Sequence, residues 1–392
     1  MVTTANQPTS MNKVLAQVPE KWNLPRTADS DWWWQVLGSQ FKAMLSAAGY
    51  SIFDQSSALV FFYQWYSWKW GFGDGAPEVR YSIEPIGHYA GAAPDPLNQN
   101  LTCDFLAQLF RSGQQGLDLE WFNHFKHALL GPGTPASKAE VASQSTLFVA
   151  FEISSGTISV KAYFIPVDAP GNSASDQISR AIASASCPNL AARNQLDIFL
   201  RKDVYGRTVK PFMLGIDCIG PAESRLKVYS RSRVTTFELV RHVMSVGGQR
   251  KGIKKAENQL HKLWKLTLGL PDDFPVDKEL SYNSHETAGV LFYFDVAPKS
   301  ALPDVKVYIP VRHYGPSDAV AANGLVQYLK SQSQGIYAQK YLETLKVFAT
   351  REGINNSNGL QTYISCAYKN GALVITSYLN PQCYHPSWFS TT

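Results

Sequence analysis

The sequence predicts an α+β fold in which about ten antiparallel strands form a barrel inside a ring of helices. Three observations lead to this prediction: strand pairs recur five times, helical segments lie between them, and each strand pair carries polar residues on one face. The repeated unit, helix–helix–strand–strand, has a period of about 65–85 residues, which is typical of repeat architecture. Because the polar face recurs, we expect it to surround a common interior, which favours a barrel over a solenoid.

Five β-hairpins are expected from short alternating segments that are separated by turn residues. The last of them contains the turn Lys369-Asn370-Gly371, and Asn-Gly is a strong hairpin signal. The expected pairs are Trp65–Gly71 with Glu78–Pro85, Leu147–Ile153 with Thr157–Pro166, Phe212–Cys218 with Arg225–Ser230, Gly289–Val296 with Asp304–Val311, and Thr362–Tyr368 with Ala372–Leu379.

Segments with helical periodicity precede each hairpin, usually two at a time. Asp31–Ala48 is expected to be the first helix. Thr235 and Glu238 have the spacing of a capping box, which predicts that Thr235 caps a later helix. The other expected helices are Cys103–Arg111, Leu119–Leu130, Ser175–Ala185, Leu190–Lys202, Phe237–Val246, Lys255–Leu266, Ala319–Ser331 and Ile336–Thr350.

Composition favours one large domain of a cytoplasmic protein. We expect the domain to cover residues 21–380, after a flexible segment 1–20 and before a tail 381–392. Five cysteines, widely spaced and without metal-ligand spacing, indicate a reducing compartment, and no apolar stretch reaches membrane-spanning length. The net charge of +5 suits a small anionic ligand better than a nucleic acid, and no membrane partner is expected. A homodimer is compatible with the sequence, which does not reveal oligomeric state.

A basic residue and a tyrosine recur together on the strands. The motif reads Val160-Lys161-Ala162-Tyr163-Phe164, then Arg225-Leu226-Lys227-Val228-Tyr229, then Val305-Lys306-Val307-Tyr308-Ile309, with a looser copy at Val79-Arg80-Tyr81-Ser82-Ile83. Since strand side chains alternate with period two, the cation and the tyrosine share one face in the first three copies. This combination suits a ligand that joins an anionic group to one that benefits from a π-face. The chain has no P-loop, no G-x-G-x-x-G after a strand and no D-D-x-x-D motif, so no metal site is expected.

Together these segments resemble the fungal dimethylallyltryptophan-synthase (DMATS)-type aromatic prenyltransferases, whose fold is called the ABBA or PT barrel. The resemblance extends from about Trp22 to Leu379. It also rests on Glu84-Pro85-Ile86-Gly87, Asp95-Pro96-Leu97-Asn98-Gln99, Asp217-Cys218 and Ser224. It implies transfer of a dimethylallyl group from an allylic diphosphate to an indole or other aromatic acceptor in fungal secondary metabolism. Dimethylallyl diphosphate would be the co-substrate, and no metal or other cofactor would be required.

The resemblance also assigns roles to individual residues. The diphosphate would be bound by Arg80, Lys161, Arg225, Lys227 and Lys306 through charge-assisted hydrogen bonds. The allylic cation would be shielded by Tyr163, Tyr229, Tyr308 and Tyr378, with each ring contributing ~0.5–2 kcal/mol. Tyr363 would flank the acceptor, although Tyr363 and Tyr378 are equally compatible with a packing role, whereas Glu84 at a strand end suggests a structural role.

The usual catalytic acid is missing. Family members carry a glutamate in the first strand that accepts the proton of the acceptor, but here Trp65 occupies that position, with Gln64 beside it. Neither side chain can act as a general base at neutral pH, so the catalytic residue is unknown. A missing piece of coding sequence, an electron-rich phenolic acceptor and a loss of activity each explain this departure. The last explanation gives an alternative function, a catalytically impaired barrel that binds an isoprenoid diphosphate or another anionic ligand.

The identity of the acceptor also stays open. Members that use tryptophan place an arginine for its carboxylate about a dozen residues before the R-x-K-x-Y segment. Here that region reads Lys210-Pro211-Phe212-Met213. Free tryptophan is therefore not assured, and an indole diketopiperazine, another indole alkaloid, a tyrosine derivative or a polycyclic phenol could serve instead.

Overall fold

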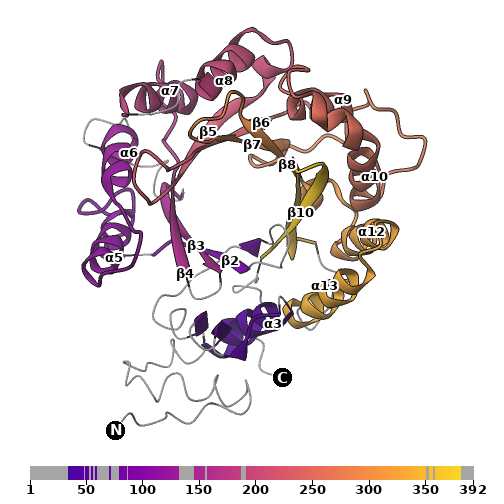
Figure 1. The fold of residues 1–392 in the computed structure, drawn as a ribbon, viewed down its shortest axis with the longest axis horizontal. Helices are drawn as coiled ribbons and strands as arrows, with labels where there is room; N and C mark the ends of the chain where they lie inside the picture. The colour runs from indigo at the N-terminus through magenta and orange to yellow at the C-terminus, as the bar shows by residue number, and fades with distance from the viewer. Residues whose placement is uncertain are drawn as a thin grey trace.

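The strands form a closed ring (Figure 1). The structure is a computed structural model that describes residues 34–47, 49–52, 54–55, 58–59, 70–71, 79–85, 87–131, 145–154, 157–186, 191–349, 353–355 and 358–380. Within these residues, ten strands make one antiparallel sheet whose spatial order is the chain order from β1 to β10. β1 also contacts β10, so the sheet closes on itself and the predicted barrel is confirmed.

The strands occur as five hairpins, close to where the alternation predicts them. In the last hairpin the turn residues Asn370 and Gly371 have φ angles of 49° and 86°, as a tight two-residue turn requires. The predicted residues 65–69 of the first hairpin lie outside the described part of the chain. The strands are β1 (Trp70–Gly71), β2 (Val79–Ile83), β3 (Leu147–Ser154), β4 (Thr157–Phe164), β5 (Lys210–Asp217), β6 (Leu226–Ser232), β7 (Val290–Val296), β8 (Asp304–Ile309), β9 (Gln361–Lys369) and β10 (Ala372–Leu379).

Helices surround the barrel on its outer side (Figure 1). Within the first predicted helix, the structure has a π-helical turn, Trp34–Gly38, followed by α3 (Ser39–Ala47). No helix in the described ranges is both long enough and apolar enough to cross a bilayer. The remaining α-helices of the described ranges are α5 (Asn100–Arg111), α6 (Glu120–Leu130), α7 (Ala174–Ser184), α8 (Ala191–Lys202), α9 (Phe237–Met244), α10 (Glu257–Leu268), α11 (Val311–Tyr314), α12 (Asp318–Ser331) and α13 (Gly335–Phe348).

The predicted cap of α9 is wrong by one residue. Thr236, not Thr235, accepts the backbone N–H of Leu239 at 3.1 Å. The hydroxyl of Thr235 accepts the N–H of Leu280 at 2.9 Å, and its own N–H donates to Glu279 at 2.6 Å. Both threonines stand next to the helix start, and the contact with a loop more than 40 residues away decides which of them caps it.

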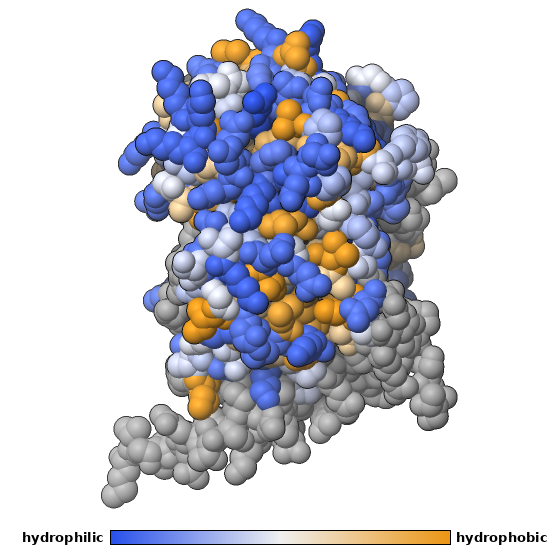
Figure 2. All heavy atoms as spheres, turned by 90° about the vertical axis from the view of Figure 1, so that its right-hand side faces the viewer, coloured by the Kyte–Doolittle hydropathy of each residue, from blue (hydrophilic) through white to orange (hydrophobic). Residues whose placement is uncertain are grey.

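Two apolar clusters lie on opposite faces of the sheet. The larger one fills the space between strands and helices and includes the fully buried rings of Phe164, Phe292 and Phe294. The smaller one is formed by Met213, Tyr229, Leu291 and Tyr308 on the inner face, and we call the space that this face surrounds the lumen. On the outside, Figure 2 shows mainly hydrophilic side chains, interrupted by apolar ones in the centre of that view.

Candidate functional site

Buried lysines point from the strands into one end of the lumen. Lys161 in β4 pairs in register with Asp217 in β5, and Lys227 in β6 pairs with Asp295 in β7. Residues opposite each other in a sheet share a face, so these charges converge although they come from four strands. Lys161 is 7% exposed and Lys227 only 3%. The predicted convergence of cations inside the barrel therefore exists.

One carboxylate joins the cations of the first two hairpins. Glu152 in β3 lies opposite Arg80 in β2. The Arg80 guanidinium donates to Glu152 Oε1 at 2.6 Å, and the Lys161 ammonium donates to Glu152 Oε2. A single carboxylate thereby fixes the direction of two side chains that the sequence predicted as anion ligands.

Two further carboxylates hold the cations of the third hairpin. Asp217 accepts from Arg225 Nε at 2.7 Å and from the ammonium of Lys227. Asp295 accepts from Arg225 at 3.1 Å and from the hydroxyl of Tyr293 at 2.5 Å. Arg225 therefore bridges β5 and β7 just ahead of the first residue of β6. These hydrogen bonds preorganise the cationic end of the lumen before any ligand is bound.

Positive charge is in excess at this end of the lumen. Burial lowers the pKa of Lys227 to about 8, although Asp217 favours its charged form. Burial, together with the charges of Lys227 and Arg80, also holds the pKa of Lys161 well below its usual range. Burial alone would raise the pKa of Asp217, but Lys227 and Arg225 outweigh that effect and lower it. A multiply charged anion would relieve the repulsion between these cations and restore their charged forms.

Lys306, the fifth predicted cation, lies on the same inner face. In β8 it pairs with Tyr293 of β7 and with Ala367 of β9. It is partly buried, and it stands one strand beyond the carboxylate of Asp295. The fold thus brings all five predicted cations to the interior of one barrel.

The four predicted tyrosines form a continuous group of rings beside the cations. Tyr229 is at the centre, with ring centroids 5.9 Å from Tyr163 and 6.1 Å from Tyr308. Tyr308 in turn lies 5.2 Å from the ring of Tyr378, and their hydroxyls are 3.3 Å apart. Burial raises the pKa of Tyr163, Tyr229 and Tyr308, so these phenols stay neutral at physiological pH.

Sequence reasoning missed two aromatic residues and three acids of the site. Phe148 stacks on Tyr163 at 4.6 Å, and Tyr293 stacks on Tyr229 at 5.1 Å. Glu152 and Asp295 were not singled out, and Asp217 was noted only as part of a resemblance. The strand periodicity could have revealed Tyr293 and Asp295, because they are two residues apart and therefore share a face. A group of five cations on one inner face also requires counter-charges, which was a reason to search for acids.

Tyr363 lies farther along the lumen, in β9 opposite Tyr378. Its ring meets that of Tyr308 edge-to-face at 5.8 Å. Arg231, a neighbour in the same end of the lumen, favours the ionised form of Tyr363, but burial outweighs this and raises its pKa. The structure therefore places Tyr363 on the inner surface, on the side of the tyrosines away from Lys227.

Glu84 takes part in loop structure outside this group. Its carboxylate accepts from the hydroxyl of Ser145 and from the amide of Asn98 at 3.5 Å. The Asn98 side chain also bonds two backbone groups: it donates to the carbonyl of Pro85 and accepts the N–H of Gly87. These contacts tie the end of β2 to the segment before α5, in agreement with a structural role for Glu84.

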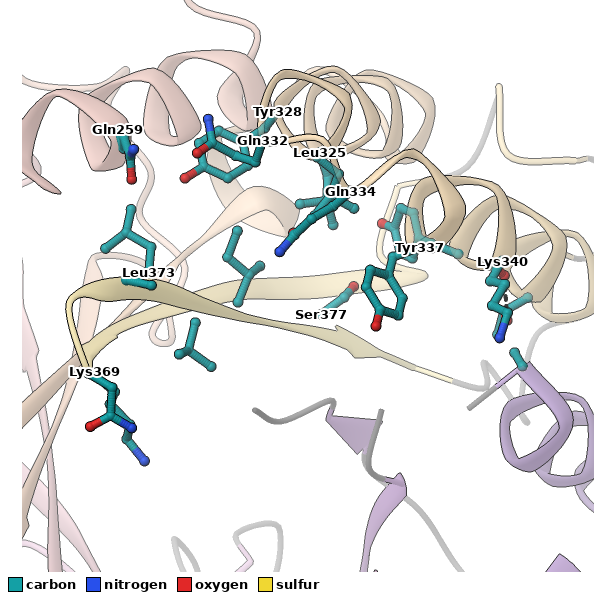
Figure 3. Close-up of a pocket in the computed structure, with 18 of the residues that line it drawn as sticks. Gln259, Leu325, Tyr328, Gln332, Gln334, Tyr337, Lys340, Lys369, Leu373 and Ser377 are labelled. Carbon is teal, nitrogen blue, oxygen red and sulfur yellow. Dashed lines mark hydrogen bonds between the residues drawn. The ribbon is translucent and has the colours of Figure 1, made fainter. Parts of the chain in front are cut away.

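A separate cavity of about 660 Å³ lies outside the lumen (Figure 3). It is formed by α12, α13 and the β9–β10 hairpin and is lined by Leu325, Tyr341, Leu373 and Ile375, among others. The β9–β10 register places Leu373 and Ile375 on the face opposite to Tyr378. This cavity therefore lies between the barrel and its helices and contains none of the predicted site residues.

A family model described as tryptophan dimethylallyltransferase matches residues 29–66 and 65–344. The chain belongs to this family of prenyltransferases. Prenyltransferase anuH of Penicillium roqueforti is 34% identical over 94% of this chain and 92% of its own. The 4-O-dimethylallyl-L-tyrosine synthase of Claviceps purpurea is 32% identical over 89% of this chain and 87% of its own. Xanthone prenyltransferase B of Emericella nidulans is 29% identical over 95% of this chain and 91% of its own.

Solved structures of prenyltransferases share the fold. The crystal structure of AnaPT from Neosartorya fischeri superposes with a TM-score of 0.77, at 21% identity over 94% of this chain and 97% of that one. NotF, crystallised with brevianamide F and DMSPP, gives a TM-score of 0.75 at 21% identity over 94% and 99%. The ABBA-type barrel predicted for this prenyltransferase is confirmed.

The match to the family model comes in two parts, which overlap in the region where the sequence analysis expects the catalytic acid. Its two parts meet at Trp65 and Tyr66, and Gln64 and Trp65 lie outside the described residues. The alignment with the Penicillium relative spans 422 positions, more than the 392 residues of this chain, so the relative has internal residues that this chain lacks. No group of three or more potential metal ligands occurs within the described ranges.

Proposed function

We propose that this prenyltransferase transfers a dimethylallyl group from dimethylallyl diphosphate to a phenolic acceptor without the help of a metal ion. The observation that carries the proposal is the junction, inside one lumen, of a buried cationic cluster and a continuous group of tyrosine rings. The cations suit a diphosphate, and the rings suit the allylic cation that forms when it leaves. The Lys and Arg side chains supply the charge that Mg²⁺ supplies in other allylic diphosphate enzymes.

In the proposed reaction the diphosphate binds Arg80, Lys161, Arg225, Lys227 and Lys306. The allylic C–O bond breaks, and its electron pair leaves with the diphosphate, whose negative charge the cations stabilise. The positive charge is shared by the two ends of the allyl group and faces the π-systems of the tyrosines. The acceptor then attacks the allyl carbon to form the new bond, and its proton passes to water. No described residue is assigned as the base.

Two observations favour a phenolic acceptor. The Claviceps and Emericella relatives are named for tyrosine O-prenylation and xanthone prenylation; tyrosine is a phenol, and a xanthone is an oxygen-containing polycyclic aromatic rather than an indole. Phe212 also occupies the region where tryptophan-using members carry an arginine. A phenol is electron-rich and easily deprotonated, so it depends less than an indole on a dedicated carboxylate base.

The proposal is tested by incubating the purified protein with dimethylallyl diphosphate and a panel of acceptors. L-Tyrosine, a hydroxyxanthone and L-tryptophan represent the three acceptor classes, and products are identified by mass spectrometry with and without EDTA. We expect a prenylated phenol in amounts that EDTA does not change. Loss of the product with EDTA, or preferential prenylation of tryptophan, would contradict the corresponding part of the proposal.

The two-part family match supports a second candidate function, a barrel that binds the diphosphate without turnover. Calorimetric titration with inorganic pyrophosphate separates the two. Binding of pyrophosphate without product from any acceptor favours the binding barrel, whereas binding together with product favours the transferase.

A further inference from the structure

A second basic residue on β6 points into the lumen, beyond the tyrosines. Arg231 follows Tyr229 by two residues and pairs in register with Leu291, which belongs to the inner apolar cluster. Lys227, Tyr229 and Arg231 therefore form a row on one face of the strand. At about 3.3 Å per residue, Arg231 lies about 13 Å from Lys227 along β6. That separation leaves room for a prenyl group and an aromatic ring between the two charges.

The guanidinium of Arg231 is incompletely satisfied. It lies over the ring of Phe212 at 4.5 Å, and its Nη1 donates to the carbonyl of Glu286 at 3.4 Å, which is a long hydrogen bond. Its Nε atom is buried and has no hydrogen-bond partner. Within the described part of the chain no carboxylate forms an ion pair with Arg231, whereas Arg80 pairs with Glu152, and Arg225 pairs with both Asp217 and Asp295.

Arg231 is partly buried. A partly buried cation without a carboxylate partner costs free energy, which an anion would recover. Burial lowers the pKa of Arg231, and the nearby charge of Arg233 acts in the same direction. Burial and the surrounding positive groups, His285, Arg312 and Arg231 among them, also lower the pKa of His313 to about 4. This end of the lumen is therefore positive, and His313 does not add or remove charge near neutral pH.

Phe212 links the incompletely satisfied guanidinium of Arg231 to acceptor binding. The region of Phe212 lacks the arginine that tryptophan-using members place there. The guanidinium of Arg231, on the neighbouring strand, nevertheless lies over the Phe212 ring. Tyr363, predicted to flank the acceptor, also interacts with Arg231. Arg231 can therefore bind an acceptor from β6 although β5 lacks the usual arginine.

We propose that Arg231 determines acceptor specificity by binding a carboxylate of the acceptor, so that the natural substrate is an aromatic acid. This inference rests on the proposed function and specifies the acceptor side of the same lumen. The bidentate fork of a guanidinium matches a carboxylate and orients the ring that carries it. The carboxylate would lie at Arg231, the ring among Tyr229, Tyr308 and Tyr363, and the diphosphate at Lys227.

If Arg231 had a purely structural role, its replacement would affect the binding of acids and esters equally. The loop carbonyls of His285 and Glu286 are already held by Arg233 through two hydrogen bonds of 2.9 Å each. Arg233 is exposed and lies just beyond β6. Arg233→Gln is therefore a matched control, because it removes a loop anchor of the same chemistry without changing the charge inside the lumen.

The test uses paired acceptors that differ only in charge: 2,4-dihydroxybenzoate with its methyl ester, and L-tyrosine with its methyl ester. Binding is measured by calorimetry in the presence of pyrophosphate, and kcat/KM is measured for every acceptor that reacts. For wild-type protein we expect the acid of at least one pair to bind at least tenfold more tightly than its ester. Arg231→Gln should weaken binding of that acid at least tenfold and leave the ester within twofold. Arg231→Lys should restore part of the loss, and Arg233→Gln should change neither.

Equal binding of acid and ester in both pairs, no binding of either acid, or an equal loss of acid and ester in Arg231→Gln would overturn the inference. Transfer of a prenyl group to the esters by Arg231→Gln would show that the proposed function stands even then. Absence of transfer by the wild type to any acceptor, with acid-selective binding retained, would instead contradict the function and support the binding site.

Discussion

Replacing Lys227 with methionine tests the anion site most directly. Methionine has nearly the length of lysine without its charge, so the change removes the ammonium and leaves most of the packing. A hydrogen bond between charged partners contributes about 1.5–3 kcal/mol. Loss of one such contact to the diphosphate should raise its dissociation constant about 10- to 150-fold. The free energy of unfolding should change less, because Asp217 keeps Arg225 at 2.7 and 3.3 Å and is not left as an unpaired buried charge.

The assay is calorimetric titration with inorganic pyrophosphate, combined with thermal unfolding to verify that the variant is folded. Lys210→Met is the matched control, because Lys210 is an exposed lysine at the start of the neighbouring strand β5. It removes the same overall charge at the opposite end of β5 from Asp217, next to Arg231 and away from the predicted diphosphate ligands. If folded Lys227→Met binds pyrophosphate within twofold of the wild type, or if Lys210→Met weakens binding equally, the assignment of Lys227 to the anion site is refuted.

Three further expectations concern the same lumen. The affinity for pyrophosphate should fall as the pH rises through about 8, because the pKa of buried Lys227 is about 8 without ligand and a bound anion must raise that pKa. Calorimetry across pH 6.5–9.5 should show that the affinity of Lys227→Met depends less on pH. Tyr229→Leu should increase the share of dimethylallyl alcohol among the products, because water reaches a less shielded cation, and Tyr229→Phe should do so less; equal alcohol in all three proteins would exclude shielding by this ring. Gly215→Ala should lower kcat, since the new Cβ would stand 3.0 Å from the ring of Tyr163, whereas Gly220→Ala, with no atom within 4 Å, should not; unchanged kinetics in both would show that the position of Tyr163 is not critical.

Local patterns were enough to predict the barrel and which of the predicted site residues share its inner face. Alternation along the strands placed Lys161 with Tyr163 and Lys227 with Tyr229, because the side-chain period of a strand does not depend on its neighbours. The sheet register confirms this placement. The cap of α9 was misplaced for the opposite reason, since the choice between two adjacent threonines is made by Glu279 in a distant loop.

The acids of the site were harder to predict. Glu152 lies among apolar residues of β3, and nothing in that segment reveals that Arg80 and Lys161 come from two neighbouring strands to share it. The same holds for Arg231, whose significance depends on Phe212 below it and on the absence of a carboxylate partner among the described residues. Ion pairing and burial arise from contacts between distant segments, and one sequence does not encode them locally.

The sequence by itself determined the repeat, the number of hairpins, and which side chains share a face with the basic–tyrosine motif. It did so because strand and helix periodicity are properties of neighbouring residues. Only the closed sheet decided that Arg80, Lys161, Arg225 and Lys227 pair with three carboxylates at one end of a lumen, that the tyrosine rings touch, and that Arg231 stands beyond them. Charges attract or repel through space rather than along the chain, so the chemistry of the site exists only after the barrel has brought its strands together.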